Sequence, residues 1–100
     1  MQSLPARAQP YKRTPTFTER TVPAGLLKEH TTKAGTWAKI VVLRGMLLYR
    51  ILSPRTQEYS LSSEVSGVVE PQVPHEVEPQ GEVEFYVEFY RIEESEEAPR

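Results

Sequence analysis

The chain has 100 residues, of which 38% are hydrophobic and 26% are charged, and its formal net charge is -2. This size allows one modest hydrophobic core and leaves no room for a second domain. The absence of cysteine excludes disulfides, thiolate zinc sites and thiol nucleophiles. No apolar run approaches the ~20 residues of a membrane span, and the N-terminal residues lack an apolar signal segment. We therefore expect a cytoplasmic protein with no membrane partner.

Charge is distributed unevenly along the chain. Residues 1 to 55 carry ten Lys or Arg and two Glu, whereas residues 56 to 100 carry two Lys or Arg and twelve Glu. Such asymmetry can mark a nucleic-acid-binding arm, but that function needs a basic face with interleaved aromatic residues or a known motif. The sequence has neither, so we expect no nucleic-acid partner. Instead we predict that basic early strands lie beside acidic late strands, where opposite charges pair across one sheet.

The N-terminal third of the chain favours extended structure. Pro5 and Pro10 interrupt residues 1–13, and the low apolar content of this segment predicts an extended arm that is ordered by docking on a neighbour. Residues 14–18 predict a short edge strand. A second short strand is predicted over residues 26–30, followed by a loop.

The apolar segment at residues 36–52, with Gly45 near its middle, predicts a β-hairpin that turns at Arg44-Gly45. A two-residue turn would give this hairpin one wholly apolar face, made of Ala38, Ile40, Val42, Leu47, Tyr49 and Ile51. The other face is also apolar apart from Lys39 and Arg50. A hairpin that is apolar on both faces must be covered on both, which predicts a sandwich or a barrel.

The second half of the chain predicts further strands and an acidic end. Strands are predicted at residues 57–62, 68–69 and 73–77, and the longest alternating run, residues 82–92, follows a predicted turn at Gln80-Gly81. The acidic residues 93–100 predict a disordered tail. Many short strands, frequent turns and no convincing helix predict an all-β fold over residues 14–92.

Two histidines are the side chains best suited to a binding site. The chain has no Asp, which excludes a Ser-His-Asp triad, and it has no glycine-rich phosphate loop. If His30 and His75 both point into one barrel, they could bind a divalent metal such as zinc. Glu88 is the preferred third ligand, with Glu84 and Glu70 as alternatives.

Each candidate site residue also has a structural interpretation. His75 could be a core histidine whose ring is satisfied by a hydrogen bond. Glu88 could pair with Lys39 or Arg50 rather than with a metal. Trp37, the only tryptophan, could form the floor of a small-molecule pocket or simply pack in the core.

Two motifs give the chain a family resemblance. Residues 30–37 read H-x4-G-x-W and residues 71–77 read P-x-x-P-H-x-V. With these motifs in this order, residues 11–91 resemble the small cupin-like domain of the TehB/YeaR type, which occurs alone and as the N-terminal part of tellurite-resistance methyltransferases. The resemblance implies a double-stranded β-helix, often dimeric, and a link to oxyanion or nitrosative stress. Metal-holding cupins usually offer H-x-H and a Glu in the first motif, whereas this chain offers His30 alone.

We therefore expect a stand-alone, homodimeric stress-response domain that binds a small molecule, an oxyanion or one divalent metal in its barrel. The expected ligand-binding residues are His30, Trp37, His75 and Glu88. One alternative is a metal-dependent enzyme, because two His and a Glu could hold a metal with open positions. Another is a dimerisation or protein-interaction module in which residues 1–13 exchange onto a second subunit.

Overall fold

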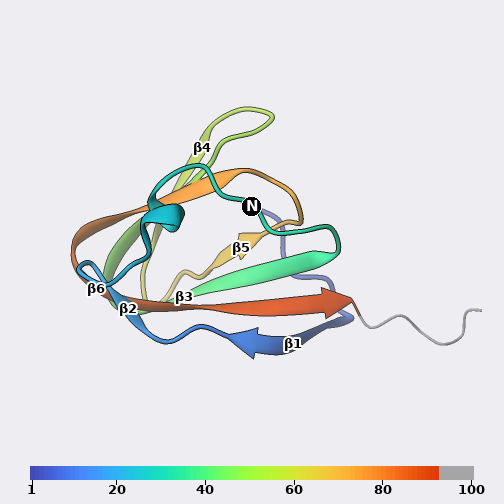
Figure 1. The fold of residues 1–100 in the computed structure, drawn as a ribbon, viewed down its shortest axis with the longest axis horizontal. Coiled ribbons are helices and arrows are strands. Elements are labelled where there is room, and N and C mark those ends of the chain that lie inside the picture. The colour runs from blue at the N-terminus through green and yellow to red at the C-terminus, as the bar shows by residue number, and fades with distance from the viewer. Residues whose placement is uncertain (93–100) are drawn as a thin grey trace, which may run out of the picture.

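Two long antiparallel strands, β3 (Thr36–Ile51) and β6 (His75–Ile92), form the centre of the fold (Figure 1). The computed structural model describes residues 1–92, and the predicted acidic tail at residues 93–100 lies outside them. The other elements are β1 (Ala8–Arg13), β2 (Phe17–Thr18), the 3-10 helix η1 (Ala24–Leu27), β4 (Gln57–Leu61) and β5 (Gly67–Val69). The six strands form one sheet in the order β1-β6-β3-β4, with β2 paired to β6 and β5 to β3. The prediction of an all-β chain is confirmed.

Gly45 lies where the sheet folds back on itself. It is opposite Val83 of β6, and its φ of 82° is one that glycine adopts without strain. A Cβ atom at this position would overlap the carbonyl oxygen of Glu82, so the absence of a side chain lets the two strands approach closely. β3 and β6 bend together, and the two halves of the sheet then face each other (Figure 1).

The predicted hairpin at Arg44-Gly45 is wrong, because β3 continues through the glycine as one strand of 16 residues. The predicted turn at Gln80-Gly81 is wrong for the same reason, since β6 is one strand of 18 residues. Both segments stay paired with each other on the two sides of the bend. The glycines therefore lie at a bend, where the register between β3 and β6 shifts, and not at a chain reversal.

The inward face of β3 nevertheless has the predicted composition. Between Val42 and Arg44, β3 advances by two residues while β6 advances by one, from Phe85 to Glu84. This one-residue bulge reverses the face to which the following side chains point, as a two-residue turn would also have done. The residues before and after the bend therefore contribute to one apolar face.

The hydrophobic core lies between the halves of the sheet. Its buried members are Ala38, Ile40, Val42, Leu47, Tyr49, Leu61, Val69, Val77, Val83, Phe85 and Val87. Five of the six residues predicted for the apolar face of residues 36–52 are among them, and the sixth, Ile51, packs against them. The alternation of residues 83–89 is also confirmed, because Val83, Phe85 and Val87 are buried and Phe89 packs beside them.

The N-terminal arm is part of the sheet of its own chain. Residues 8–13 form the edge strand β1, with Ala8 opposite Ile92 and Arg13 opposite Glu88 of β6. Of the short edge strand predicted at residues 14–18, only Phe17–Thr18 is a strand, β2. The strand predicted at residues 26–30 is wrong, because η1 occupies residues 24–27 and only His30 makes an isolated β-bridge. Within residues 1–92, no helix has the length and apolarity needed to cross a bilayer.

Opposite charges pair across neighbouring strands of the sheet. Arg50 of β3 forms ion pairs with Glu58 of β4 and with Glu76 and Glu78 of β6. Two further cross-strand pairs join Arg44 to Glu84 at 3.5 Å and Arg13 to Glu88 at 3.2 Å. The prediction that basic early strands lie beside acidic late strands is confirmed by these pairs of Arg13, Arg44 and Arg50.

Candidate functional site

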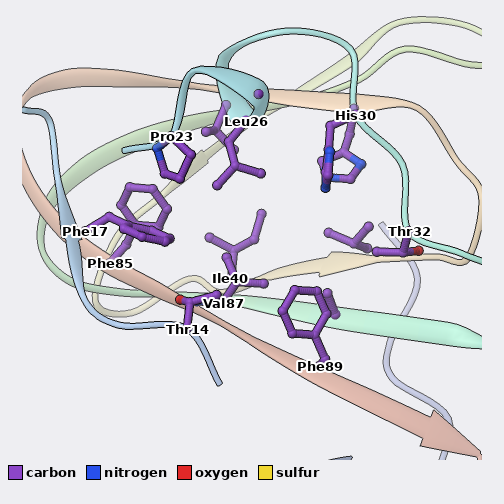
Figure 2. Close-up of a pocket in the computed structure, with 15 residues that line it drawn as sticks. Thr14, Phe17, Pro23, Leu26, His30, Thr32, Ile40, Phe85, Val87 and Phe89 are labelled. Carbon is purple, nitrogen blue, oxygen red and sulfur yellow. The ribbon is translucent and has the colours of Figure 1, made fainter. Parts of the chain in front are cut away.

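A cavity of about 280 Å³ lies between the two halves of the folded sheet (Figure 2). It is lined by Thr14, Phe17, Pro23, Gly25, Leu26, His30, Thr32, Ala38, Ile40, Val69, His75, Val77, Phe85, Val87 and Phe89. Phe17 and Phe85 lie at one end, and His30 and Thr32 lie at the other (Figure 2). None of these lining residues is Lys, Arg, Asp or Glu. The cavity therefore has mainly apolar walls, and its more polar end is the one at His30 and Thr32.

The structure brings His30 and His75 together at that polar end. The backbone N–H of each residue donates to the carbonyl oxygen of the other, both at 2.8 Å. The two imidazole rings meet edge to face, with their centroids 5.3 Å apart. The ring of Tyr49 packs against His75 with a centroid distance of 5.9 Å, which supports the imidazole from the core. Backbone pairing and ring packing together fix the position of His75 at the cavity.

His75 is held in its neutral form. It is 5% exposed, and its Nδ1 lies 3.0 Å from the carbonyl oxygen of Val73. This contact assigns the proton to Nδ1 and leaves the lone pair on Nε2. Burial lowers the pKa of His75, the hydrogen bond to Val73 opposes that shift, and the nearby His30 adds to it. At neutral pH the ring therefore presents a hydrogen-bond acceptor and no positive charge.

Two threonine hydroxyls also reach the cavity, but both are engaged within the protein. Oγ1 of Thr14 donates to the carbonyl of Pro15 and accepts a hydrogen bond from the backbone N–H of Val87. Oγ1 of Thr32 donates to the carbonyl of Thr36 at 2.8 Å. Because these hydroxyls already have partners, the imidazole nitrogens are the polar groups best placed to meet a ligand.

Glu88 does not join the histidines. Its neighbours Val87 and Phe89 point into the cavity, so Glu88 points to the opposite face of β6. There it accepts a hydrogen bond from the Tyr90 hydroxyl at 2.8 Å and forms an ion pair with Arg13, and these two contacts lower its pKa. The structural interpretation, in which Glu88 pairs with a basic residue, describes what the structure shows, although the ion-pair partner is Arg13.

Trp37 also lies outside the cavity. Its neighbour Ala38 lines the cavity and is buried, so Trp37 points to the other face of β3. In the ladder it is opposite Tyr90 of β6. The expected role of Trp37 in a pocket wall is therefore not met.

The donors at the histidine pair do not fit a divalent metal. Catalytic zinc sites use three protein ligands, whereas residues 1–92 contain no group of three His, Cys, Asp or Glu placed to hold a metal ion. Of the alternative third ligands, Glu84 pairs with Arg44, and Glu70 is not among the residues that line the cavity. Nδ1 of His75 is occupied by Val73. Within the described residues, the histidine pair therefore lacks the third ligand that such a zinc site needs.

The aromatic residues of the cavity wall were not recognised in the sequence as site residues. Phe17 and Phe85 pack edge to face with their centroids 5.7 Å apart, and Phe89 lies nearer the histidine end. The alternation of β6 places Phe85 and Phe89 on the inward face, but alternation does not distinguish a filled core from a cavity wall. Only the bend that separates the two halves of the sheet creates the space.

A family model for the TehB-like domain matches residues 12–87 of the chain. The chain is 36% identical over 72 residues to the probable S-adenosyl-L-methionine-dependent methyltransferase TehB of Haemophilus influenzae. This alignment covers 68% of the chain and 25% of that protein, so the chain spans about a quarter of the length of this curated relative.

Two solved structures resemble the fold closely. The crystal structure of TehB from Haemophilus influenzae matches with a TM-score of 0.81 and 32% identity, over 87% of this chain and 32% of that chain. The crystal structure of a protein from Escherichia coli strain K12 matches with a TM-score of 0.85 over 94% of this chain and 100% of that chain. Its identity is 21%, so this second likeness concerns the fold alone.

Proposed function

Because the chain belongs to the TehB-like domain family, we propose that it is a small-molecule-binding module of the tellurite-resistance or stress-response type. The observation that carries the proposal is the cavity of about 280 Å³, whose apolar walls end at His30 and His75. Ligand pockets are usually concave and mainly apolar, with a few polar groups that fix orientation, and their volumes start at about 300 Å³. The cavity therefore suits a small ligand.

The chemistry of the lining favours a molecule with an apolar body. Residues such as Ile40, Phe85 and Val87 offer only hydrocarbon surface, and the lining contains no Lys or Arg. A bare inorganic oxyanion would lose its hydration in this interior without gaining an opposite charge. We therefore propose a ligand whose apolar part fills the cavity and whose polar group lies at the histidine end.

The proposal does not include methyl transfer. The name of the Haemophilus influenzae relative describes an S-adenosyl-L-methionine-dependent methyltransferase, but the alignment with this chain covers 25% of that protein. We assign ligand binding to the domain because the cavity provides an apolar surface and a polar end that a small ligand can contact.

A pair of matched variants tests the proposal. Leu26 lines the cavity, whereas the adjacent Leu27 is 41% exposed and is not among the lining residues. In Leu26→Trp the indole fills part of the cavity, and in Leu27→Trp the same side chain is added outside it. We use 1-octanol as the probe, because it combines an apolar chain with one hydroxyl, and follow amide chemical shifts by NMR.

We expect 1-octanol to shift resonances of residues around the cavity in the wild type and in Leu27→Trp, and not in Leu26→Trp. Amide spectra of the free proteins show whether each variant is folded. Equal binding by both variants, or no binding by the wild type, would overturn the proposal.

A further inference from the structure

A second hollow, of about 310 Å³, adjoins the cavity at its histidine end. His30, Thr32 and Phe89 line both spaces and so form their common boundary. Figure 2 shows these three side chains on the same side of the cavity, away from Phe17 and Phe85. The hollow therefore lies beyond the polar end of the apolar cavity.

The hollow differs from the cavity in its charge. Lys12 and Lys33 line it, and none of its described lining residues is acidic. The Nζ atom of Lys12 lies 5.9 Å from the centroid of the Phe89 ring, which is itself part of the cavity wall. A positive charge is thus placed directly outside the apolar space.

Within residues 1–92, neither Lys12 nor Lys33 takes part in the cross-strand ion pairs of the sheet. The ion pairs formed within residues 1–92 take their cations from Arg13, Arg20, Arg44 and Arg50. Glu88 points to the opposite face of β6, where its two carboxylate oxygens are engaged by Arg13 and Tyr90. Lys12 and Lys33 are therefore the cations that an anion at the boundary would meet.

We propose that the ligand is a small apolar carboxylate, with its hydrocarbon part in the cavity and its carboxylate at Lys12 and Lys33. This inference rests on the proposed function and adds the charge and the orientation of the ligand. Inside the cavity, Nε2 of His75 presents a lone pair and so cannot donate a hydrogen bond to a carboxylate, and the lining contains no Lys or Arg. In the hollow the carboxylate keeps contact with water and gains two opposite charges.

Octanoate and 1-octanol test the inference, because they share a chain length and differ in charge. Their affinities are measured by NMR titration for the wild type, Lys12→Gln, Lys33→Gln and the double variant. Lys28→Gln is the matched control, since Lys28 is an exposed lysine next to η1 that lines neither space. Thermal denaturation verifies that all four variants fold as the wild type does.

We expect the wild type to bind octanoate more tightly than 1-octanol at low salt. Each single substitution in the hollow should weaken octanoate binding about 2- to 5-fold, the range of exposed ion pairs, and should leave 1-octanol binding unchanged. Added salt should narrow the difference between the two probes. Lys28→Gln should bind both probes as the wild type does.

The failures of the two proposals are distinguishable. If 1-octanol binds and octanoate binds no better, or if Lys12→Gln and Lys33→Gln retain the wild-type affinity for octanoate, the carboxylate inference is overturned and the cavity remains a binding site. If neither probe binds the wild type, the proposed function is overturned together with the inference.

Discussion

His30 and His75 hydrogen-bond to each other through both backbone groups, and their rings meet edge to face 5.3 Å apart. This pairing connects the segment after η1 to the first residue of β6 and closes one end of the cavity. The two histidines therefore have a structural and a chemical role at once. They fix the cavity and provide its polar groups.

The stability of the fold should decrease as the pH falls through the histidine range. Burial lowers the pKa of His75 below its ordinary value of 6.5. At a pH between the pKa of His75 in the folded protein and its pKa in the unfolded chain, the unfolded chain therefore binds more protons. The free energy of unfolding then decreases on acidification, and the contribution of neutral His75 is fully present only above about pH 6.5. Urea denaturation at pH 7.5 and pH 5.5 measures this difference.

His75→Gln is the control for that prediction, because glutamine does not titrate. The difference in stability between pH 7.5 and pH 5.5 should be smaller in this variant than in the wild type. An unchanged difference would mean that another group causes the pH dependence.

Gly45→Ala should destabilise the fold more than Gly81→Ala. Both glycines have positive φ, 82° and 89°, and alanine in such a conformation costs about 1–2 kcal/mol from the backbone alone. At Gly45 the added Cβ atom also overlaps the Glu82 carbonyl, whereas at Gly81 it meets no atom within 4 Å. Chemical denaturation measures the free energy of unfolding of both variants, and the difference between them reports the overlap with the Glu82 carbonyl. Equal losses of unfolding free energy would show that the bend tolerates a side chain at Gly45.

Tyr49→Phe should lower the stability by about 1 kcal/mol. The buried Tyr49 hydroxyl donates to the carbonyl of Val68 at 2.9 Å, and burial raises the pKa of this phenol, so it stays protonated. The substitution removes the donor and keeps the ring. Tyr86→Phe, on the outward face of β6, serves as the control and should be close to neutral; a comparable loss in both variants would contradict the role of the buried hydrogen bond.

Arg50→Gln should lower the melting temperature and weaken its dependence on salt. Arg50 contacts three carboxylates on two neighbouring strands, and those hydrogen bonds raise its pKa above the ordinary value. Removing the cation leaves Glu58, Glu76 and Glu78 close together without their common partner. Arg55→Gln, an exposed position between β3 and β4, is the comparison. Thermal scans at low and high salt that did not distinguish the two variants would contradict this account.

The all-β class and the inward faces could be predicted because they depend on local alternation. Apolar residues recur every second position on each side of the bend in β3 and β6, and the bulge near Arg44 brings both parts of β3 onto one face. The continuity of these strands could not be predicted, since Gly45 and Gly81 carry the same signal in a tight turn as in a bend. Whether the chain turns or bends at these glycines is decided by pairing over the whole length of β3 and β6.

The candidate site could be predicted only in part. The histidines were chosen for their chemistry, and the structure places them together. Glu88 and Trp37 were chosen for their chemistry, but each alternates with neighbours that line the cavity, so both point to the outward face. Lys12 and Phe89 were not recognised because they belong to strands that become neighbours only when β1 joins the edge of the sheet. Pairing of distant segments, and not residue type, completes the site.

Direct contact between a bound probe and the cavity wall would show that the cavity is the binding site. In isotope-filtered NMR of the labelled protein with 1-octanol, we expect nuclear Overhauser effects from the alkyl chain to the methyl groups of Ile40, Val69 and Val77, which line the cavity and are buried. Contacts confined to exposed residues such as Leu43 and Met46, with none to the three cavity residues, would contradict the assignment of the cavity as the binding site.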